Sequence, residues 1–114
     1  MSAERSGAAP DRRGNAARGE AEILVGGERL ILRPSFAALV AAEEELGSLF
    51  GLVERAAEGG LRLAEIAGLF WHCLVIKPEG LTRERLGEAI TQAGLATATP
   101  VLKVLLTQIL QGRV

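Results

Sequence analysis

The chain has 114 residues, a formal net charge of −1 and a hydrophobic fraction of 48%. A chain of this length forms one domain and buries roughly two thirds of the surface that it exposes when unfolded. Its single cysteine, Cys73, excludes an intrachain disulfide, and its longest apolar runs, 68–76 and 100–110, fall short of the ~20 residues that span a membrane. We therefore expect a single-domain cytoplasmic protein that does not enter a membrane.

Residues 1–18 differ in composition from the rest of the chain. They hold four arginines against two acidic residues, which leaves the remainder of the chain mildly acidic. Their Ala, Gly, Ser and Arg content cannot build a core, and they lack the apolar stretch of a signal peptide. We predict a disordered tail over residues 1–18 and one folded domain over residues 19–114.

The first predicted element is a β-hairpin, because apolar residues alternate on both sides of a glycine pair. Gly26 and Gly27 supply the positive φ angles of a two-residue primed turn. This turn sets the register of the two strands. One face then holds the pairs Val25 with Glu28, Ile23 with Leu30, and Ala21 with Leu32. The other face is mostly polar and brings Glu20 opposite Arg33.

Four or five short helices follow the hairpin, and capping residues indicate their ends. The first is expected between Ser35 and Gly47, with Phe36, Leu39, Val40 and Leu46 at helical spacing. The second ends at Gly59 and Gly60, the third covers 61–76, the fourth runs from Thr82 to Gly94, and the fifth opens with Pro100 and ends before Gly112. The predicted fold class is α+β and mostly α, an N-terminal β-hairpin followed by a helical bundle.

His72 and Cys73 are residue types that serve as base and nucleophile in enzymes. Adjacent residues of a helix point about 100° apart, so these two side chains do not face each other. We expect Cys73 to be a small buried hydrophobe on one stripe with Ile66 and Phe70. One histidine and one cysteine cannot supply the four ligands of a structural zinc. The sequence therefore predicts no enzyme, no cofactor and no metal.

The third and fourth predicted helices offer an alternative, a helix-turn-helix regulator. Arg83 and Arg85 start the fourth helix, where a recognition helix contacts bases. Against this alternative, the connecting turn is longer than the usual three or four residues. The folded part is also acidic, whereas a surface that binds phosphates is basic. We therefore expect no nucleic-acid partner.

The apolar content exceeds what one hairpin and a few short helices bury, so part of it is expected to contact a partner. Trp71 lies off the main stripe of the third helix and is either a core residue or an interface anchor. Val101, Val104 and Gln108 form a second line on the fifth helix. The acids at 43–45 are either a solvated helix face or a docking patch for a basic partner. The candidate partner-binding residues are Trp71, Val101, Val104, Glu43 and Glu44.

The order of motifs along the chain carries a family resemblance. An Arg-Gly-Glu start leads into a hairpin, an Ala- and Leu-rich helix that ends in Gly, a short helix that ends near Gly, and a third apolar helix. This order, over about residues 18 to 80, resembles the small tail proteins of gene transfer agents and related phages, a family of tail assembly chaperones. The positions that carry it are Arg18, Gly19, Glu20, Gly27, Leu39, Glu43 and Gly47. After residue 80 the chain departs from the Gly-rich segment of the family.

The resemblance implies a tail assembly chaperone that binds the tape measure protein or other tail proteins during tail morphogenesis. A second copy of the chain is another candidate partner. The same family has been described as a tail tube component, so a structural role in the tail is the alternative. A tape measure protein is a long, largely helical, hydrophobic chain, which a small helical protein with spare apolar surface can cover. A tube subunit is normally a closed β structure, whereas this sequence predicts one hairpin, so we favour the chaperone.

Overall fold

The computed structural model describes residues 20–112. Within this range an antiparallel hairpin of β2 (Ala21–Val25) and β3 (Glu28–Leu32) precedes five helices. The helices are α1 (Phe36–Leu46), α2 (Leu49–Ala57), α3 (Leu63–Cys73), α4 (Arg83–Ala93) and α5 (Leu95–Gln111). The predicted fold class, mostly α with an N-terminal hairpin, is confirmed. The tail predicted over residues 1–18 lies outside the described residues.

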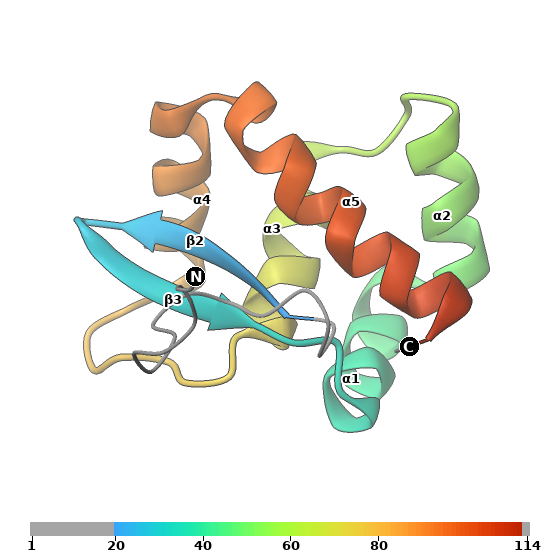
Figure 1. Ribbon diagram of the computed structural model, residues 1–114, viewed down its shortest axis with the longest axis horizontal. Coiled ribbons are helices and arrows are strands. Elements are labelled where there is room, and N and C mark those ends of the chain that lie inside the picture. Colours follow the sequence, from blue (N-terminus) through green and yellow to red (C-terminus); the bar gives the residue numbers. More distant parts are fainter. Residues whose placement is uncertain (1–19, 113–114) are drawn as a thin grey trace, which may run out of the picture.

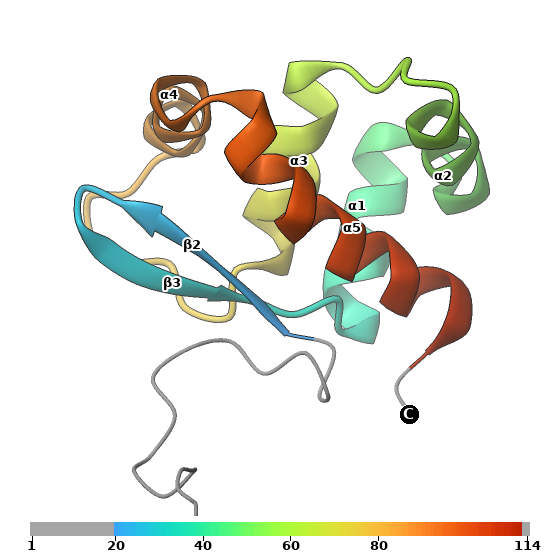
Figure 2. The same ribbon diagram turned by 45° about the horizontal axis from the view of Figure 1, so that its top comes forward.

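The helix α3 lies at the centre of the arrangement (Figure 1). The helices α1 and α4 both pack against α3, and α5 contacts both α4 and β2. Seen from a second direction, the hairpin lies at one end of the molecule and α2 at the other, while α5 crosses over α3 between them (Figure 2). The chain therefore wraps around one central helix.

The hairpin has the register predicted from its glycine turn. Gly26 and Gly27 have φ angles of 58° and 82°, which a side chain would disfavour. The paired residues are Ala21 with Leu32, Ile23 with Leu30 and Val25 with Glu28. At the open end, Arg33 donates two hydrogen bonds to Glu20 Oε2, from Nε at 3.1 Å and from Nη2 at 2.8 Å. This ion pair lies where the sequence placed Glu20 opposite Arg33.

The core is one apolar cluster around α3. Its largest fully buried side chain is Phe70, and the predicted stripe of Ile66, Phe70 and Cys73 is buried as a whole. The other large, fully buried side chains are Leu32, Leu52, Leu69, Leu86, Ile90 and Leu105. Burying a side chain of this size stabilises the fold by about 1.5–3 kcal/mol. The hairpin is held to the helices through Leu32, which belongs to this cluster.

The large apolar residues that the sequence shows at helical spacing on α1 are not the ones that it buries fully. Ser35 caps the helix by accepting a hydrogen bond from the Ala38 N–H group, as expected, but the buried residues are Ala38 and Ala42. Phe36 and Val40 are exposed. The reason is the close approach of α1 to α3, where a Cβ atom added to Gly68 would lie 3.2 Å from Leu46 Cδ2. Alanine fits such an interface, whereas a phenylalanine would force the two helices apart.

The third helix is shorter than the predicted range of 61–76. It ends at Cys73, and the residues that follow pair with β3 in an isolated bridge between Leu32 and Leu74. The Cys73 carbonyl accepts from the Arg33 N–H at 2.7 Å, and the Val75 N–H donates to the Ile31 carbonyl at 2.9 Å. Because these backbone groups bond to β3, they cannot continue the helical ladder, and α3 ends before Pro78.

The fifth helix begins earlier than predicted, at Leu95, with Pro100 inside it. Gly94 ends α4 and caps α5 at a φ angle of 94°, so the chain turns sharply at one residue. The residues before the proline are held by Ala98, which is buried in the core, and by the Thr99 hydroxyl, which donates to the Leu95 carbonyl at 2.8 Å. Proline lacks one N–H group, and this packing outweighs the loss of one backbone hydrogen bond.

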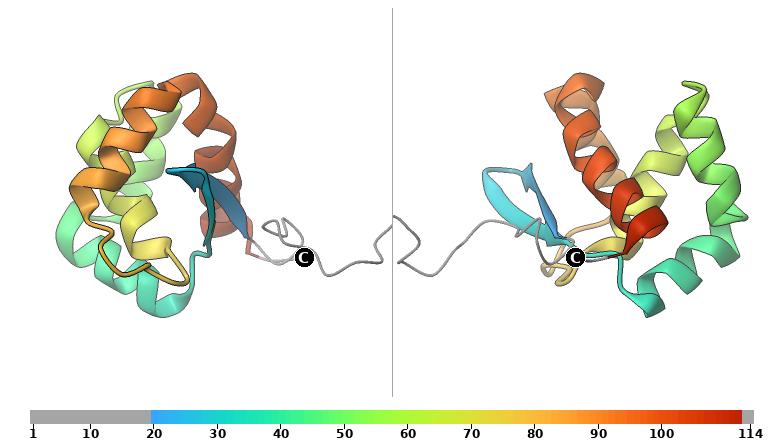
Figure 3. Two further views of the ribbon diagram at one scale, coloured as in Figure 1. Left: turned by 90° about the vertical axis from the view of Figure 1, so that its left-hand side faces the viewer. Right: turned by 45° about the vertical axis from the view of Figure 1, so that its right-hand side comes forward.

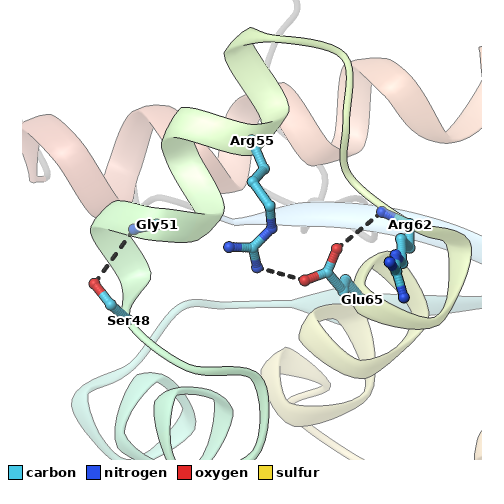
Figure 4. A network of polar contacts seen from close by, with 5 residues as sticks. All are labelled: Ser48, Gly51, Arg55, Arg62 and Glu65. Carbon is cyan, nitrogen blue, oxygen red and sulfur yellow. Dashed lines mark hydrogen bonds and ion pairs between the residues drawn. The ribbon is translucent and has the colours of Figure 1, made fainter.

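A polar network attaches α2 to α3 (Figure 4). Glu65 accepts a hydrogen bond from the Arg62 N–H at 2.9 Å and forms an ion pair with Arg55 of α2. These two bonds, the backbone one first, lower the pKa of Glu65. At the other end of α2, the Ser48 hydroxyl accepts from the Gly51 N–H at 3.3 Å. The short helix α2 is therefore capped at its start and tied down near its end.

Among the helices of residues 20–112, none is long and apolar enough by itself to cross a membrane. Only α4 and α5 taken together reach that length and composition, and they are bent by 116°.

Candidate functional site

His72 and Cys73, the two residues with potential catalytic chemistry, lie in different environments and contact different side chains. Cys73 is buried in the core, and this burial raises the pKa of its thiol to about 12. The thiol therefore stays protonated at neutral pH and is not a nucleophile. His72 points to Glu45, with 2.7 Å between His72 Nε2 and Glu45 Oε1. Within the described part of the chain, no group of three or more His, Cys, Asp or Glu side chains is arranged to hold a metal ion.

Glu45 is the centre of a charged cluster that joins three helices. Its carboxylate, on α1, binds His72 of α3 through Oε1 and Arg83 of α4 through Oε2. The hydrogen bond from Arg83, followed by that from His72, lowers the pKa of Glu45 from 4.5 to about 2. Of the acids at 43–45, this one is therefore committed to contacts within the protein rather than to a basic partner.

Trp71 lies beside this cluster and is half-buried against the core. Lys77 Nζ is 5.2 Å from the centroid of the indole ring, and Arg83 Cζ is 6.0 Å from it. Both distances are in the range of cation–π interactions. The structure thus gives Trp71 a core contact and a pair of cations, and its predicted role as an interface anchor stays a prediction.

The predicted second line of α5 is half-buried. Val101 packs against the core cluster. Val104 and Gln108 line a shallow groove of about 390 Å³ on the surface of α5, together with Lys103. The Gln108 side-chain oxygen is buried and has no hydrogen-bond partner among residues 20–112. Trp71 and Val104 therefore do not lie in the same hollow, although both were predicted as partner contacts.

Glu43 and Glu44 are both exposed on α1. The Glu43 Oε2 atom accepts a hydrogen bond from the Leu49 N–H at 3.2 Å, so this side chain helps to start α2. Glu44 makes no hydrogen bond or ion pair with the rest of residues 20–112. The acidic run therefore has three separate roles: a contact to α2, a solvated carboxylate and the bridge at Glu45.

The sequence did not predict a patch of exposed apolar side chains on α1, α2 and α5. Phe36 is 84% exposed, Phe50 is 75% exposed and Leu110 is 54% exposed. A small cavity of about 150 Å³ lies between Phe50 and Leu110 and is bordered by Glu43. Phe36, Val40 and Glu43 occupy one face of α1 at positions i, i+4 and i+7, so this apolar face leads to the cavity. The end of α5 lies close to α1 and α2 (Figure 3).

We name this surface the α1–α2–α5 patch. Its residues are Phe36, Val40, Glu43, Leu49, Phe50, Val53, Ile109 and Leu110. The signal that could have identified it is the aromatic residue in the first turn of each of two neighbouring helices, Phe36 after Ser35 and Phe50 after Ser48. The sequence placed Phe36 at helical spacing with Leu39 and Val40, and this spacing does not show which face of a helix is buried.

A family match covers all of the described residues. The model of a family described as "Phage tail tube protein, GTA-gp10" matches residues 18–112. Neither a curated protein nor a solved structure shows a significant match. The family match extends beyond residue 80, where the resemblance seen in the sequence ended, and so includes α4 and α5. The chain therefore belongs to the phage tail protein family described as phage tail tube protein, GTA-gp10.

Proposed function

We propose that this protein is a tail assembly chaperone that acts in the cytoplasm and binds the tape measure protein before the tail tube forms around it. A tape measure protein exposes long apolar helical segments until it is enclosed. A chaperone for such a client needs an accessible apolar surface that accepts a helix. The α1–α2–α5 patch has this character.

The observation that carries the proposal is the exposure of Phe50 at an apolar cavity, together with the exposure of Phe36 on the face of α1 that holds Glu43 of the same cavity. Contiguous exposed apolar patches mark interaction sites, and large aromatic side chains supply much of the binding energy when they are buried. The cavity beside Phe50 gives an apolar side chain of the client a place to insert. Among the partner-binding residues predicted from the sequence, Glu43 belongs to this patch, whereas Trp71 and Val104 lie outside it.

A second candidate function, a structural subunit of the tail tube, is favoured by the description of the family. Its physical difficulty is the small amount of sheet. Residues 20–112 form one two-stranded sheet, and five helices make up the rest of the regular structure. A tube subunit of the usual kind continues a closed β structure from one copy to the next, and this part of the chain offers only one hairpin for that purpose.

Co-expression with the tape measure protein from the same gene cluster tests the proposal. The chaperone role predicts that the wild-type chain keeps the tape measure protein in the soluble fraction, and that Phe36→Ser with Phe50→Ser abolishes this effect. Leu24→Ser is the matched control, because Leu24 is 58% exposed on the hairpin and far from the patch along the chain. Equal loss in both variants would show that the patch is not the client surface.

Analysis of purified particles separates the two candidates. A chaperone leaves its client when the tail is complete, so the chain should be absent from finished particles. A tube subunit should be present in many copies per particle. Detection of the chain in stoichiometric amount in washed particles would overturn the chaperone and support the structural role.

A further inference from the structure

A larger hollow than the cavity of the α1–α2–α5 patch lies between the end of α1, the start of α3 and α4. It is a groove of about 1030 Å³. Its apolar lining consists of Leu46, Leu63, Ala64, Ala67 and Gly87. Leu63 is exposed to solvent, and the alanines and the glycine leave room for another backbone to approach closely. The groove therefore offers apolar surface lined by small residues, on which a helix of a partner can pack closely.

The rim of the groove is acidic. Four glutamates and one arginine, Arg83, are its charged lining residues. Glu45 is bound to Arg83 and His72, and Glu65 is bound to Arg55. The other two, Glu84 and Glu88, lie one turn apart on α4 and make no hydrogen bond or ion pair with any other part of residues 20–112. Two carboxylates at i and i+4 are thus available at the edge of an apolar groove.

We propose that this groove binds an amphipathic helix of a partner protein whose apolar face is flanked by lysine or arginine. The apolar lining would receive the apolar face, and the carboxylates of Glu84 and Glu88 would pair with cations one turn apart on the partner. The arginine-containing residues 1–18 of the chain itself are an alternative occupant by charge. They contain only one large apolar side chain, Met1, so they match the rim and not the lining.

This inference does not rest on the proposed function. The α1–α2–α5 patch and the groove have no lining residue in common, and Glu43 borders the first while Glu45 borders the second. The tape measure protein can therefore be bound at the patch whether or not a basic helix occupies the groove. Charge is the difference between the two surfaces, since the groove carries four acidic residues and the cavity of the patch carries one.

Trp71 provides the readout, because it is the only tryptophan of the chain and Arg83 connects it to the groove. The probe is a model helical peptide of leucine and lysine, about 18 residues or five turns long, without tryptophan. Its counterpart has glutamate in place of lysine. We expect the leucine–lysine peptide to change the fluorescence of Trp71 in a saturable manner. Its affinity should fall at high salt, because salt screens the attraction between the charges. The leucine–glutamate peptide should have no effect.

Reversing the charge of the two rim glutamates tests whether the peptide contacts the rim of the groove. Glu84→Lys with Glu88→Lys should weaken binding of the leucine–lysine peptide by about tenfold and should create binding of the leucine–glutamate peptide. The control is Glu54→Lys with Glu58→Lys, which makes the same charge change at the same sequence spacing on two exposed positions, one in α2 and one at its C-cap. An equal loss in this control would mean that only net charge attracts the peptide and would overturn the proposal.

Gly87→Leu gives a second test that leaves every charge in place. A Cβ added at Gly87 would lie 3.9 Å from the Ala67 Cβ, an ordinary contact, and Gly87 lines the groove, so a larger side chain at this position should occupy the groove. We expect a folded protein that no longer binds the leucine–lysine peptide. Unchanged binding would overturn the proposal. Binding that appears only after deletion of residues 2–17 would also overturn it, because the tail would then be the natural occupant.

Discussion

His72 Nε2 lies 2.7 Å from Glu45 Oε1, and this contact joins α3 to the end of α1 across 27 positions of sequence. The second oxygen of the same carboxylate binds Arg83 of α4. A single glutamate therefore holds together three helices that pack around the core. Its neighbour Glu44 is exposed to solvent, so a substitution at Glu44 is a matched control for the contribution of this bridge to stability.

Glu45→Gln should reduce stability at neutral pH and make no difference in strong acid. The pKa of Glu45 is lowered from 4.5 to about 2 in the folded protein, so its contribution is fully present above pH 4.5 and is lost as the pH falls toward 2. The side chain is 40% exposed, so solvent screening limits the effect to about 1 kcal/mol. Thermal unfolding measured between pH 7 and pH 2 tests this. Glu44→Gln should leave the midpoint unchanged throughout, and a parallel response of both variants would contradict the prediction.

Gly27→Val should destabilise the protein by about 1 kcal/mol or more, because Gly27 has a φ angle of 82° that a β-branched residue strongly disfavours. A Cβ atom there meets nothing within 4 Å, so the cost is one of backbone conformation and not of a clash. Gly27→Asn is the control, since asparagine tolerates positive φ angles better. Denaturant unfolding should rank wild type above Gly27→Asn and Gly27→Asn above Gly27→Val. Equal stability of the two variants would show that the turn is not strained by a side chain.

Gly87→Ala should stabilise the protein by about 0.5–1 kcal/mol, because alanine lowers the entropy of the unfolded chain and favours the helix. Its Cβ would lie 3.9 Å from Ala67 Cβ, which is an ordinary contact. Gly68→Ala has the same intrinsic gain, but its Cβ would lie 3.2 Å from Leu46 Cδ2 where α1 and α3 meet. We therefore expect a higher thermal midpoint for Gly87→Ala than for Gly68→Ala. The reverse order would be inconsistent with the packing of α1 on α3.

Cys73 should resist thiol reagents in the folded protein and react fully once the protein is denatured. Burial raises the pKa of its thiol to about 12, so both the thiolate and access to the sulfur are missing in the native state. Because the chain has one cysteine, the number of labels per chain reports this site alone. Labelling at pH 8 with and without denaturant checks the expectation. Rapid labelling without denaturant would mean that the end of α3 opens.

Trp71→Ala with Val104→Ser should cost less stability than Phe70→Ala. Phe70 is fully buried, and truncating such a side chain costs about 3–5 kcal/mol, whereas Trp71 and Val104 are half-buried. If these two residues contact a partner, the double variant should also capture less tape measure protein in a pull-down. Unfolding as readily as Phe70→Ala would assign both residues to the core. If the double variant stays folded and captures as much tape measure protein as the wild type, Trp71 and Val104 are not client contacts, and the α1–α2–α5 patch remains the candidate surface.

The sequence alone determined the features that depend on neighbours a few residues apart. The glycine pair and the alternation on both sides of it predicted the register of the hairpin. Ser35 and Thr82 marked two helix starts, because a side-chain oxygen at that position accepts an N–H group three residues later. Gly47 and Gly94 marked two helix ends for the same local reason, a φ angle that only glycine adopts freely.

Only the tertiary structure decided the features that depend on distant partners. The third helix ends at Cys73 because β3, some 40 positions earlier, takes the backbone groups of residues 73–75. The fifth helix starts before Pro100 because Ala98 packs into the core. Helical spacing placed Phe36 on a stripe, but the contact between α1 and α3 selected the alanine face for burial and left Phe36 in water. Burial of a face is set by what packs against it, which no local pattern contains, and for that reason the exposed patch and the acidic groove are visible only in the folded protein.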